Sequence, residues 1–207
     1  QTLNVAIGSP RVTNKSNFNY LLTNHALPIA PPSEAAMIFS RVWAMPNPET
    51  FSISPIASFI RRWRDAIPGR GIDPFAKNKQ IVEYTNDLDP STSAQHHMDA
   101  ADFCRSLAGT AFSFALFDPP YSPRQIAECY KGFGREVTGK DTQNAALYKR
   151  VRDALDPLIE VGGIVLSFGW SSGGMGKTRN YEIEEILLVA HGEAHNDTIC
   201  LAERKLQ

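Results

Sequence analysis

The chain has 207 residues, of which 43% are hydrophobic, and its formal net charge at pH 7 is −1. This length and apolar content suffice for one globular domain with a sizeable core, and they exclude a wholly disordered chain. The near-neutral charge gives no sign of the wide basic surface that nucleic-acid-binding proteins usually carry. Two short basic runs, 61–64 and 149–152, leave a local patch or a solvated helix face as alternatives.

The cysteines and the hydropathy pattern indicate the compartment. Cys104, Cys129 and Cys200 are widely spaced and form no metal-binding pattern, so we expect free thiols in a reducing cytoplasm and no metal site. No apolar run reaches the roughly 18 residues that a membrane helix needs. The sequence therefore predicts a soluble, cytoplasmic protein with no membrane partner.

Residues 1–50 are rich in Asn and Pro and carry no clear periodicity. We predict an irregular N-terminal arm that packs on the domain through aromatic side chains such as Phe18, Tyr20, Phe39 and Trp43. It is equally compatible with a substrate-recognition arm. Residues 51–207 are predicted to form a single globular unit.

A helix is predicted to begin at Ser54, with that residue as its N-cap and Pro55 at the first helical position. Ile56, Phe59 and Ile60 follow at helical spacing, which gives the helix one apolar face. Strand-like and helical segments then alternate, which is typical of a mostly parallel α/β sheet with helices on both faces. The strand-like segments before the centre of the chain are 72–76, 81–87 and 112–117, with a helix at 100–107.

The second half continues with helices at 122–133 and 143–159, a turn at 161–163 and an apolar strand at 164–168. Residues 169–177 are rich in glycine and predict a flexible loop near the substrate; they lack the spacing of a phosphate-binding loop. The runs 181–190 and 197–203 are rich in β-forming residues and are joined by a short connection. They predict an antiparallel terminal strand pair.

The apolar strand 112–117 ends in Asp118-Pro119-Pro120-Tyr121. The prolines cannot donate to a sheet ladder and they fix φ, so the turn is stiff and ends the strand. Ligands of open α/β sheets bind at this carboxyl edge. The turn offers carboxylate and carbonyl acceptors and an aromatic face, which suit a planar base with an exocyclic amino group. The simpler alternative is a proline-stiffened turn with a capping acid.

Three further acids, Asp73, Asp87 and Asp99, each end a strand-like segment that precedes this turn. Their order and spacing suggest ligand roles at the same sheet edge. Each also has a structural alternative as a helix cap or a turn former.

These motifs resemble those of the S-adenosylmethionine-dependent amino methyltransferases, the N6-adenine and N4-cytosine DNA methylases. The resemblance covers roughly residues 50–203 and implies a Rossmann-like methyltransferase fold. It implies a catalytic role for Asp118, Pro119, Pro120 and Tyr121, of which Asp118 and Pro119 hold the amino group while Tyr121 stacks on the base. The base must be flipped out of a duplex or be single-stranded to reach such a site.

The same resemblance implies S-adenosylmethionine as the cofactor. Asp73 belongs to the first cofactor motif, Asp87 takes the ribose hydroxyls and Asp99 meets the adenine. The full set of implied cofactor-binding residues is Ser54, Pro55, Ile56, Asp73, Pro74, Phe75, Asp87, Asp99 and Ala100. Lys77 stands where the family has glycine, and its side chain either crowds the cofactor or pairs with its carboxylate.

The implied activity is methyl transfer to a nucleobase amino group, with adenine N6 in DNA ahead of cytosine N4. The partner is then nucleic acid, DNA ahead of RNA, and the 207 residues leave no room for the family's separate recognition lobe. A separate specificity subunit or the N-terminal arm would supply target recognition. The alternatives are a non-catalytic partner subunit or nucleic-acid-binding module of the same fold, and a methyltransferase acting on RNA or another amine.

Overall fold

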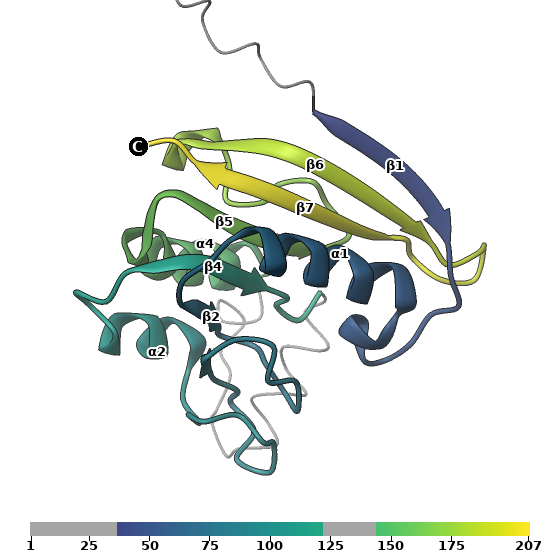
Figure 1. Cartoon of the computed structure of the whole chain (residues 1–207). Coiled ribbons are helices and arrows are strands. Elements are labelled where there is room, and N and C mark those ends of the chain that lie inside the picture. Colours follow the sequence, from purple (N-terminus) through teal and green to yellow (C-terminus); the bar gives the residue numbers. More distant parts are fainter. Residues whose placement is uncertain (1–36, 122–143) are drawn as a thin grey trace, which may run out of the picture. The chain divides into compact units, whose positions relative to one another are not determined.

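The computed structural model describes residues 37–121 and 144–207, which lie within one compact unit of the chain. Seven strands form one sheet in the order β1–β6–β7–β5–β4–β2–β3 (Figure 1). β4 (Phe112–Phe117) pairs in parallel with β2 (Gly71–Asp73) and with β5 (Ile159–Gly169), and β3 (Tyr84–Thr85) pairs in parallel with β2. The carboxyl ends of these four strands therefore meet at one edge of the sheet.

The other half of the sheet contains the only reversal of strand direction among the described residues. β7 (Thr198–Lys205) runs antiparallel to both β5 and β6 (Tyr181–Ala190). β1 (Ile38–Trp43) pairs in parallel with β6 and forms the outer edge of the described sheet. The predicted antiparallel pair is confirmed, although β1 and not this pair lies at the edge.

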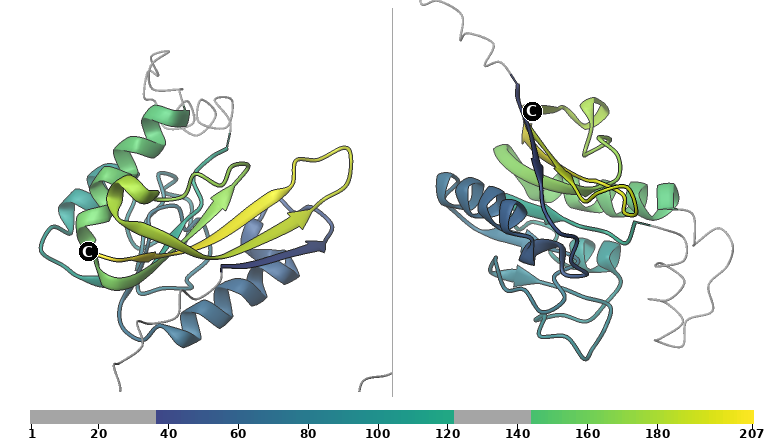
Figure 2. Two further views of the ribbon diagram at one scale, coloured as in Figure 1. Left: turned by 90° about the horizontal axis from the view of Figure 1, so that it is seen from above. Right: turned by 90° about the vertical axis from the view of Figure 1, so that its right-hand side faces the viewer.

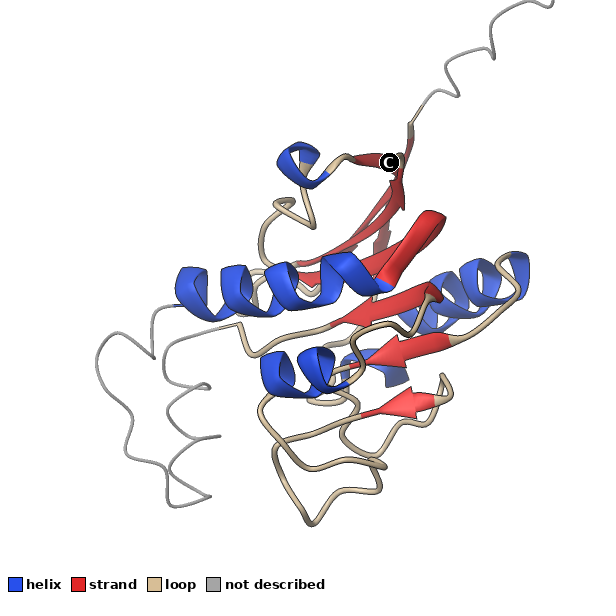
Figure 3. Cartoon of the chain, turned by 90° about the vertical axis from the view of Figure 1, so that its left-hand side faces the viewer, coloured by secondary structure: helices blue, strands red, loops and turns tan. Residues whose placement is uncertain are grey.

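Helices cover both faces of the sheet. α1 (Ser54–Ala66) packs on one face, and α2 (Ala100–Ser106) and α4 (Asn144–Leu155) pack on the other (Figure 2, right-hand view; Figure 3). β4 serves both layers because its side chains alternate: Phe114 and Leu116 join the α1 core, and Ala115 and Phe117 join the opposite core. The predicted α/β fold class, a mostly parallel Rossmann-like sheet with helices on both faces, is confirmed.

Several local predictions need correction. The N-cap of α1 is Ile53, with no side-chain cap, so Ser54 is already in the first helical turn. Only Tyr84 and Thr85 of the predicted strand 81–87 pair with β2. The predicted turn at 161–163 lies inside β5, where the pairing with β4 shifts register. Short 3-10 turns occur at η1 (Thr50–Ser52), η2 (Asp156–Leu158) and η3 (Lys177–Arg179).

The prediction of an irregular, packed arm is wrong for residues 38–43, which form strand β1. Phe39 and Trp43 are 61% and 63% exposed, so they do not pack on the domain. Backbone pairing with β6 holds this strand, and such pairing leaves no apolar pattern in the sequence. Residues 1–36 and 122–143, which include Phe18, Tyr20, Cys129 and the predicted helix 122–133, lie outside the described residues. The division at residue 50 stays a prediction.

Cys104 and Cys200 are free and buried. Within 37–121 and 144–207, no helix is both long enough and apolar enough to cross a bilayer.

Candidate functional site

Three acidic side chains gather at the carboxyl edge of the parallel strands. Asp73 is the last residue of β2, Asp87 lies two residues beyond β3, and Asp118 directly follows β4. Burial raises the pKa of Asp73 well above its usual range, and the charges of Asp118 and Asp87 raise it further. We call these three residues the acidic cluster.

Asp73 is the most unusual member of the acidic cluster because it is fully buried. Its Oδ1 accepts a hydrogen bond from the Phe75 backbone N–H at 2.9 Å, which ties the carboxylate to the turn that follows β2. Its Oδ2 is buried and has no hydrogen-bond partner among the described residues. A buried carboxylate with an unused acceptor is costly unless a ligand supplies a donor, and a cationic donor suits it best.

Asp87 closes the turn after β2. Its Oδ2 accepts the backbone N–H of Lys77 at 3.0 Å, and its Oδ1 accepts the backbone N–H of Asp89 at 2.9 Å. Each carboxylate oxygen has two lone-pair sites, so both retain capacity for ligand hydroxyls. Asn86, which precedes it, is fully buried and its side chain donates to the Pro74 and Met98 carbonyls, fixing the strand ends relative to each other.

Asp99 caps a helix, which was the structural alternative to its predicted ligand role. It is the N-cap of α2, where its Oδ1 accepts the N–H groups of Ala101 and Asp102 at 3.0 and 3.4 Å. Its Oδ2 pairs with Arg150 at 2.9 Å. Ala100 is buried in the first turn of the same helix. A contact of these two residues with the cofactor's adenine stays a prediction.

The segment that enters α1 lies against the β4 turn. Phe51 packs edge-on against Phe168 of β5, with ring centroids 5.0 Å apart. The Thr50 side chain lies close enough to this turn to lower the pKa of Asp118 and of Tyr121. Among the predicted cofactor residues of this segment, Ser54 is exposed, Pro55 is partly buried and Ile56 is fully buried in the core.

The Asp118-Pro119-Pro120-Tyr121 turn is held by hydroxyl groups. The Tyr121 hydroxyl donates to Asp118 Oδ1, and the Tyr148 hydroxyl of α4 donates to the Pro120 carbonyl at 2.9 Å. Burial raises the pKa of Asp118, while the hydrogen bonds from Tyr121 and Thr50 and the charge of Lys77 oppose the rise. Burial followed by the charge of Asp118 raises the pKa of Tyr121 well above its usual range, so this phenol remains a donor.

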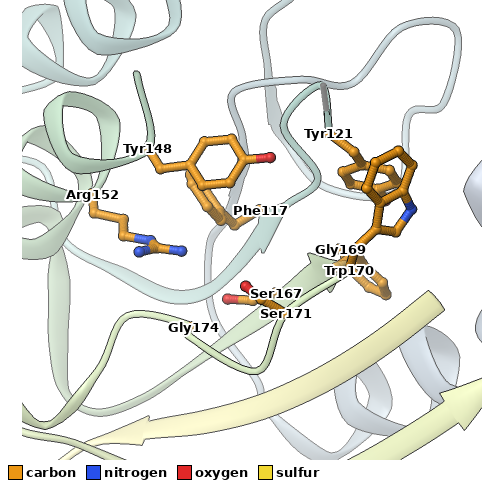
Figure 4. Close-up of a pocket in the computed structure, with 10 residues that line it drawn as sticks. Phe117, Tyr121, Tyr148, Arg152, Ser167, Gly169, Trp170, Ser171 and Gly174 are labelled. Atoms are coloured by element: carbon orange, nitrogen blue, oxygen red, sulfur yellow. The ribbon is translucent and has the colours of Figure 1, made fainter. Parts of the chain in front are cut away.

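A pocket of about 200 Å³ opens beside this turn, at the ends of β4 and β5 (Figure 4). We call it the aromatic pocket; its lining includes Phe117, Tyr121, Tyr148, Arg152, Ser167 and Trp170. The rings of Tyr121 and Trp170 lie together on one side, with centroids 5.6 Å apart and an interplanar angle of 53°.

The opposite side of the aromatic pocket carries a positive charge. The Arg152 guanidinium lies over the rings of Phe117 and Tyr148, 5.3 and 5.5 Å from their centroids. Its Nε is buried and has no hydrogen-bond partner among the described residues. Flat aromatic walls and unused donors suit a planar ligand with acceptor atoms on its edge.

The glycine-rich loop is anchored, which differs from the predicted flexible loop. Glu203 of β7 is buried, and its carboxylate accepts the backbone N–H groups of Met175 and Gly176 at 2.7 and 3.1 Å. Gly174 has φ +42°, and a Cβ there would lie 2.1 Å from Glu203 Oε2. Glycine is therefore needed for the close approach that places this loop at the wall of the pocket.

Sequence reasoning missed Thr50, Tyr148, Arg152, Trp170 and Glu203 as contributors to the site. Trp170 had a usable signal, because it follows the apolar strand 164–168 and so falls at the same sheet edge as Asp118. The other four come from a 3-10 turn, a helix and an antiparallel strand, and only the packing brings them together. In the described part of the chain, no group of three or more His, Cys, Asp or Glu side chains is placed to hold a metal ion.

Comparisons with known proteins find likeness in structure alone. No family model and no curated protein matches the sequence. Among solved structures, TrmN from Thermus thermophilus is 16% identical with a TM-score of 0.48, over 74% of this chain and 49% of that one. This chain thus spans about half the length of TrmN.

Two archaeal structures are similar at lower scores. A methyltransferase homolog protein from Pyrococcus horikoshii is 14% identical with a TM-score of 0.41, over 82% of this chain and 62% of that one. The tRNA (uracil-54, C5)-methyltransferase from Pyrococcus abyssi, in complex with S-adenosyl-L-homocysteine, is 13% identical with a TM-score of 0.40, over 74% and 38%. At these identities and scores the activities named belong to those proteins, and the functional argument for this chain rests on its own site.

Proposed function

We propose that this protein transfers a methyl group from S-adenosylmethionine to the exocyclic amino group of a nucleobase, with adenine N6 in DNA as the first substrate. The observation that carries the proposal is the position of Asp118. Asp118 is a member of the acidic cluster, and its carboxylate also accepts a hydrogen bond from Tyr121, which lines the aromatic pocket. A cationic methyl donor and a flat acceptor are the ligands that these two regions suit.

The acidic cluster fits the cofactor. Asp73 has a buried acceptor oxygen to which no described residue donates, and this oxygen suits the ammonium of the cofactor's amino-acid end. Asp87 retains acceptor capacity for ribose hydroxyls at the end of β3. The entry to α1, with Thr50 touching the catalytic turn, would border the same ligand. When bound, the cofactor supplies an electrophilic methyl group on a positively charged sulfur.

The chain's own residues then position the acceptor. Asp118 and the Pro119 carbonyl accept hydrogen bonds from the amino group, which favours a more tetrahedral, electron-rich nitrogen. Tyr121 occupies one site on Asp118 Oδ1, and because each carboxylate oxygen has two lone-pair sites, Asp118 retains acceptor capacity for the amino group. Holding the reactants in attack geometry can contribute roughly 7–11 kcal/mol. The nitrogen releases one proton as it gains the methyl group, and Asp118, whose pKa burial raises, is placed to take it.

The aromatic pocket receives the base. Tyr121 and Trp170 offer ring faces for stacking, and Arg152 offers a donor to acceptor atoms of the base edge. A base in a duplex cannot reach this position, so the nucleotide must be flipped out or single-stranded. The near-neutral chain gives little general attraction to phosphates, so a specificity subunit or residues 1–50 would add target affinity.

The test is incubation of the protein with methyl-labelled cofactor and matched DNA and RNA, followed by nucleoside analysis. Label in N6-methyladenine of DNA, absent in the Asp118→Ala variant, supports the proposal. Label found only in RNA would support methyl transfer to a nucleobase but would overturn DNA as the substrate. Binding of cofactor to the wild type without transfer to any nucleic acid, or no binding at all, would favour a non-catalytic partner subunit.

A further inference from the structure

Lys77 adopts a backbone conformation that L residues rarely take. Its φ is +48°, and the other described non-glycine residue with positive φ is Asn180, a residue type that tolerates this region. The conformation is held from several sides: Lys77 N–H donates to Asp87, and the Ala76 N–H donates to the Asn86 carbonyl at 2.9 Å. A strained residue kept in place at a ligand-binding edge points to a function for its side chain.

The ammonium of Lys77 lies beside the segment that leads into η1 and α1. Its Nζ is 3.4 Å from the Pro48 carbonyl oxygen, just before the η1 turn. Its charge also reaches Asp118, whose pKa it lowers. The Pro48 carbonyl accepts a hydrogen bond from one of the three ammonium N–H groups, and the other two have no acceptor among the described residues. Lys77 is thus an exposed, positively charged residue with a partly unsatisfied ammonium, and its backbone is hydrogen-bonded to Asp87 of the acidic cluster.

We propose that Lys77 binds the carboxylate at the amino-acid end of the cofactor, an inference that rests on the proposed function. That end of the ligand carries one ammonium and one carboxylate. Asp73 offers a buried acceptor for the ammonium, and Lys77, four residues further along the same turn, offers the complementary charge. A glycine at position 77 would relieve the backbone but supply no charge, which explains why a lysine is kept in a left-handed conformation.

The test is calorimetric titration with two ligands that differ at this end. S-adenosylhomocysteine carries the amino-acid group, and 5′-methylthioadenosine keeps the adenosine and the thioether but lacks it. Lys77→Gln should weaken S-adenosylhomocysteine binding about tenfold, equivalent to about 1.4 kcal/mol, and change 5′-methylthioadenosine binding less than twofold. Lys77→Gly should weaken S-adenosylhomocysteine equally while raising the melting temperature. Lys79→Gln, in the same loop, is the matched control and should change neither affinity.

Other outcomes identify what failed. Tighter S-adenosylhomocysteine binding by Lys77→Gln or Lys77→Gly would mean that the side chain obstructs the ligand, and would overturn the inference. An equal loss for both ligands would assign the effect to the shape of the turn and would also overturn it. If the wild type binds neither ligand, the proposed function falls together with the inference. If it binds both and Lys77→Gln changes nothing, the inference alone falls.

Discussion

The acidic cluster and the aromatic pocket are neighbours at one sheet edge, yet they are built in opposite ways. The acidic cluster consists of carboxylates at or just beyond the ends of β2, β3 and β4, and one of them, Asp73, is buried with an oxygen that has no hydrogen-bond partner in the described part of the chain. The aromatic pocket consists of rings and one guanidinium from β4, α4 and the loop after β5. The first region suits a cation and the second a flat, neutral group rich in acceptors. A variant in the acidic cluster should therefore change cofactor binding, and a variant in the aromatic pocket should change binding of the nucleic acid. Asp118 belongs to the first region and contacts the second, so its replacement should change methyl transfer itself.

Asp118→Ala should have the largest effect, because it removes the one group shared by both regions. We expect methyl transfer to fall by about 10²–10⁴-fold, the range for a positioned proton-transfer group. Affinity for S-adenosylhomocysteine should stay within about twofold, since Asp73 and Asp87 remain. Single-turnover transfer and calorimetry measure the two quantities. Asp102→Ala, an exposed acid of α2, is the control. Retention of full activity in Asp118→Ala would remove the basis of the comparison.

Trp170→Ala tests the aromatic pocket alone. Stacking of a base on an aromatic side chain contributes about 1–3 kcal/mol, so KM for the nucleic acid should rise on the order of tenfold. The affinity for S-adenosylhomocysteine should not change. Trp43→Ala is the control, because Trp43 is also exposed but lies on β1 at the outer edge of the described sheet. A loss of cofactor affinity in Trp170→Ala would show that the two regions are not separate.

Asp87→Ala tests the acidic cluster alone. Loss of hydrogen bonds to a charged acceptor costs about 1.5–3 kcal/mol, so cofactor affinity should fall by about tenfold or more, with acceptor KM unchanged. The variant also leaves the Lys77 and Asp89 N–H groups without their acceptor, so its free energy of unfolding should fall. Asp89→Ala, which changes the same loop but leaves Asp87 in place, separates the two effects. Normal cofactor affinity in Asp87→Ala would assign the ribose to another residue.

The fold was predictable wherever burial marks the sequence. β4 was predicted with its exact bounds because both of its faces are buried, and β6 because its residues favour strands. β1 was not predicted, since an edge strand held by backbone pairing can expose its side chains. β3 was overestimated because the sequence shows β-forming residues but not how many find a partner.

For the site, local motifs were visible and distant contributions were not. Asp73, Asp87 and the Asp118–Tyr121 turn lie at or just beyond the ends of strands, so their place at the sheet edge follows from strand order. Arg152 of α4 and Glu203 of β7 reach the site only because the fold packs these elements beside it. The residues next to them in the sequence give no sign of a role at the site. The left-handed conformation of Lys77 was also hidden, because lysine is a residue that seldom marks such a turn.

Asp73→Asn should give the smallest effect and the sharpest test of the strain within the acidic cluster. Because the folded-state pKa of Asp73 is raised, folding favours its neutral form. The wild type is then fully stable below the ordinary carboxyl pKa of about 3.9 and loses stability as pH rises through the raised folded value. The asparagine cannot ionise, so the variant should match the wild type near pH 3.5 and exceed it by about 1 kcal/mol or more at neutral pH.

Urea unfolding between pH 3.5 and 8 without ligand measures this difference. Excess S-adenosylhomocysteine should reverse it, because a bound ammonium stabilises the ionised acid and only the wild type offers one. A difference that is the same at every pH would mean that Asp73 is not strained by burial, and the cation-binding role of the cluster would lose its physical basis. A pH-dependent difference that the ligand does not reverse would keep the strain but assign the ammonium to another acid.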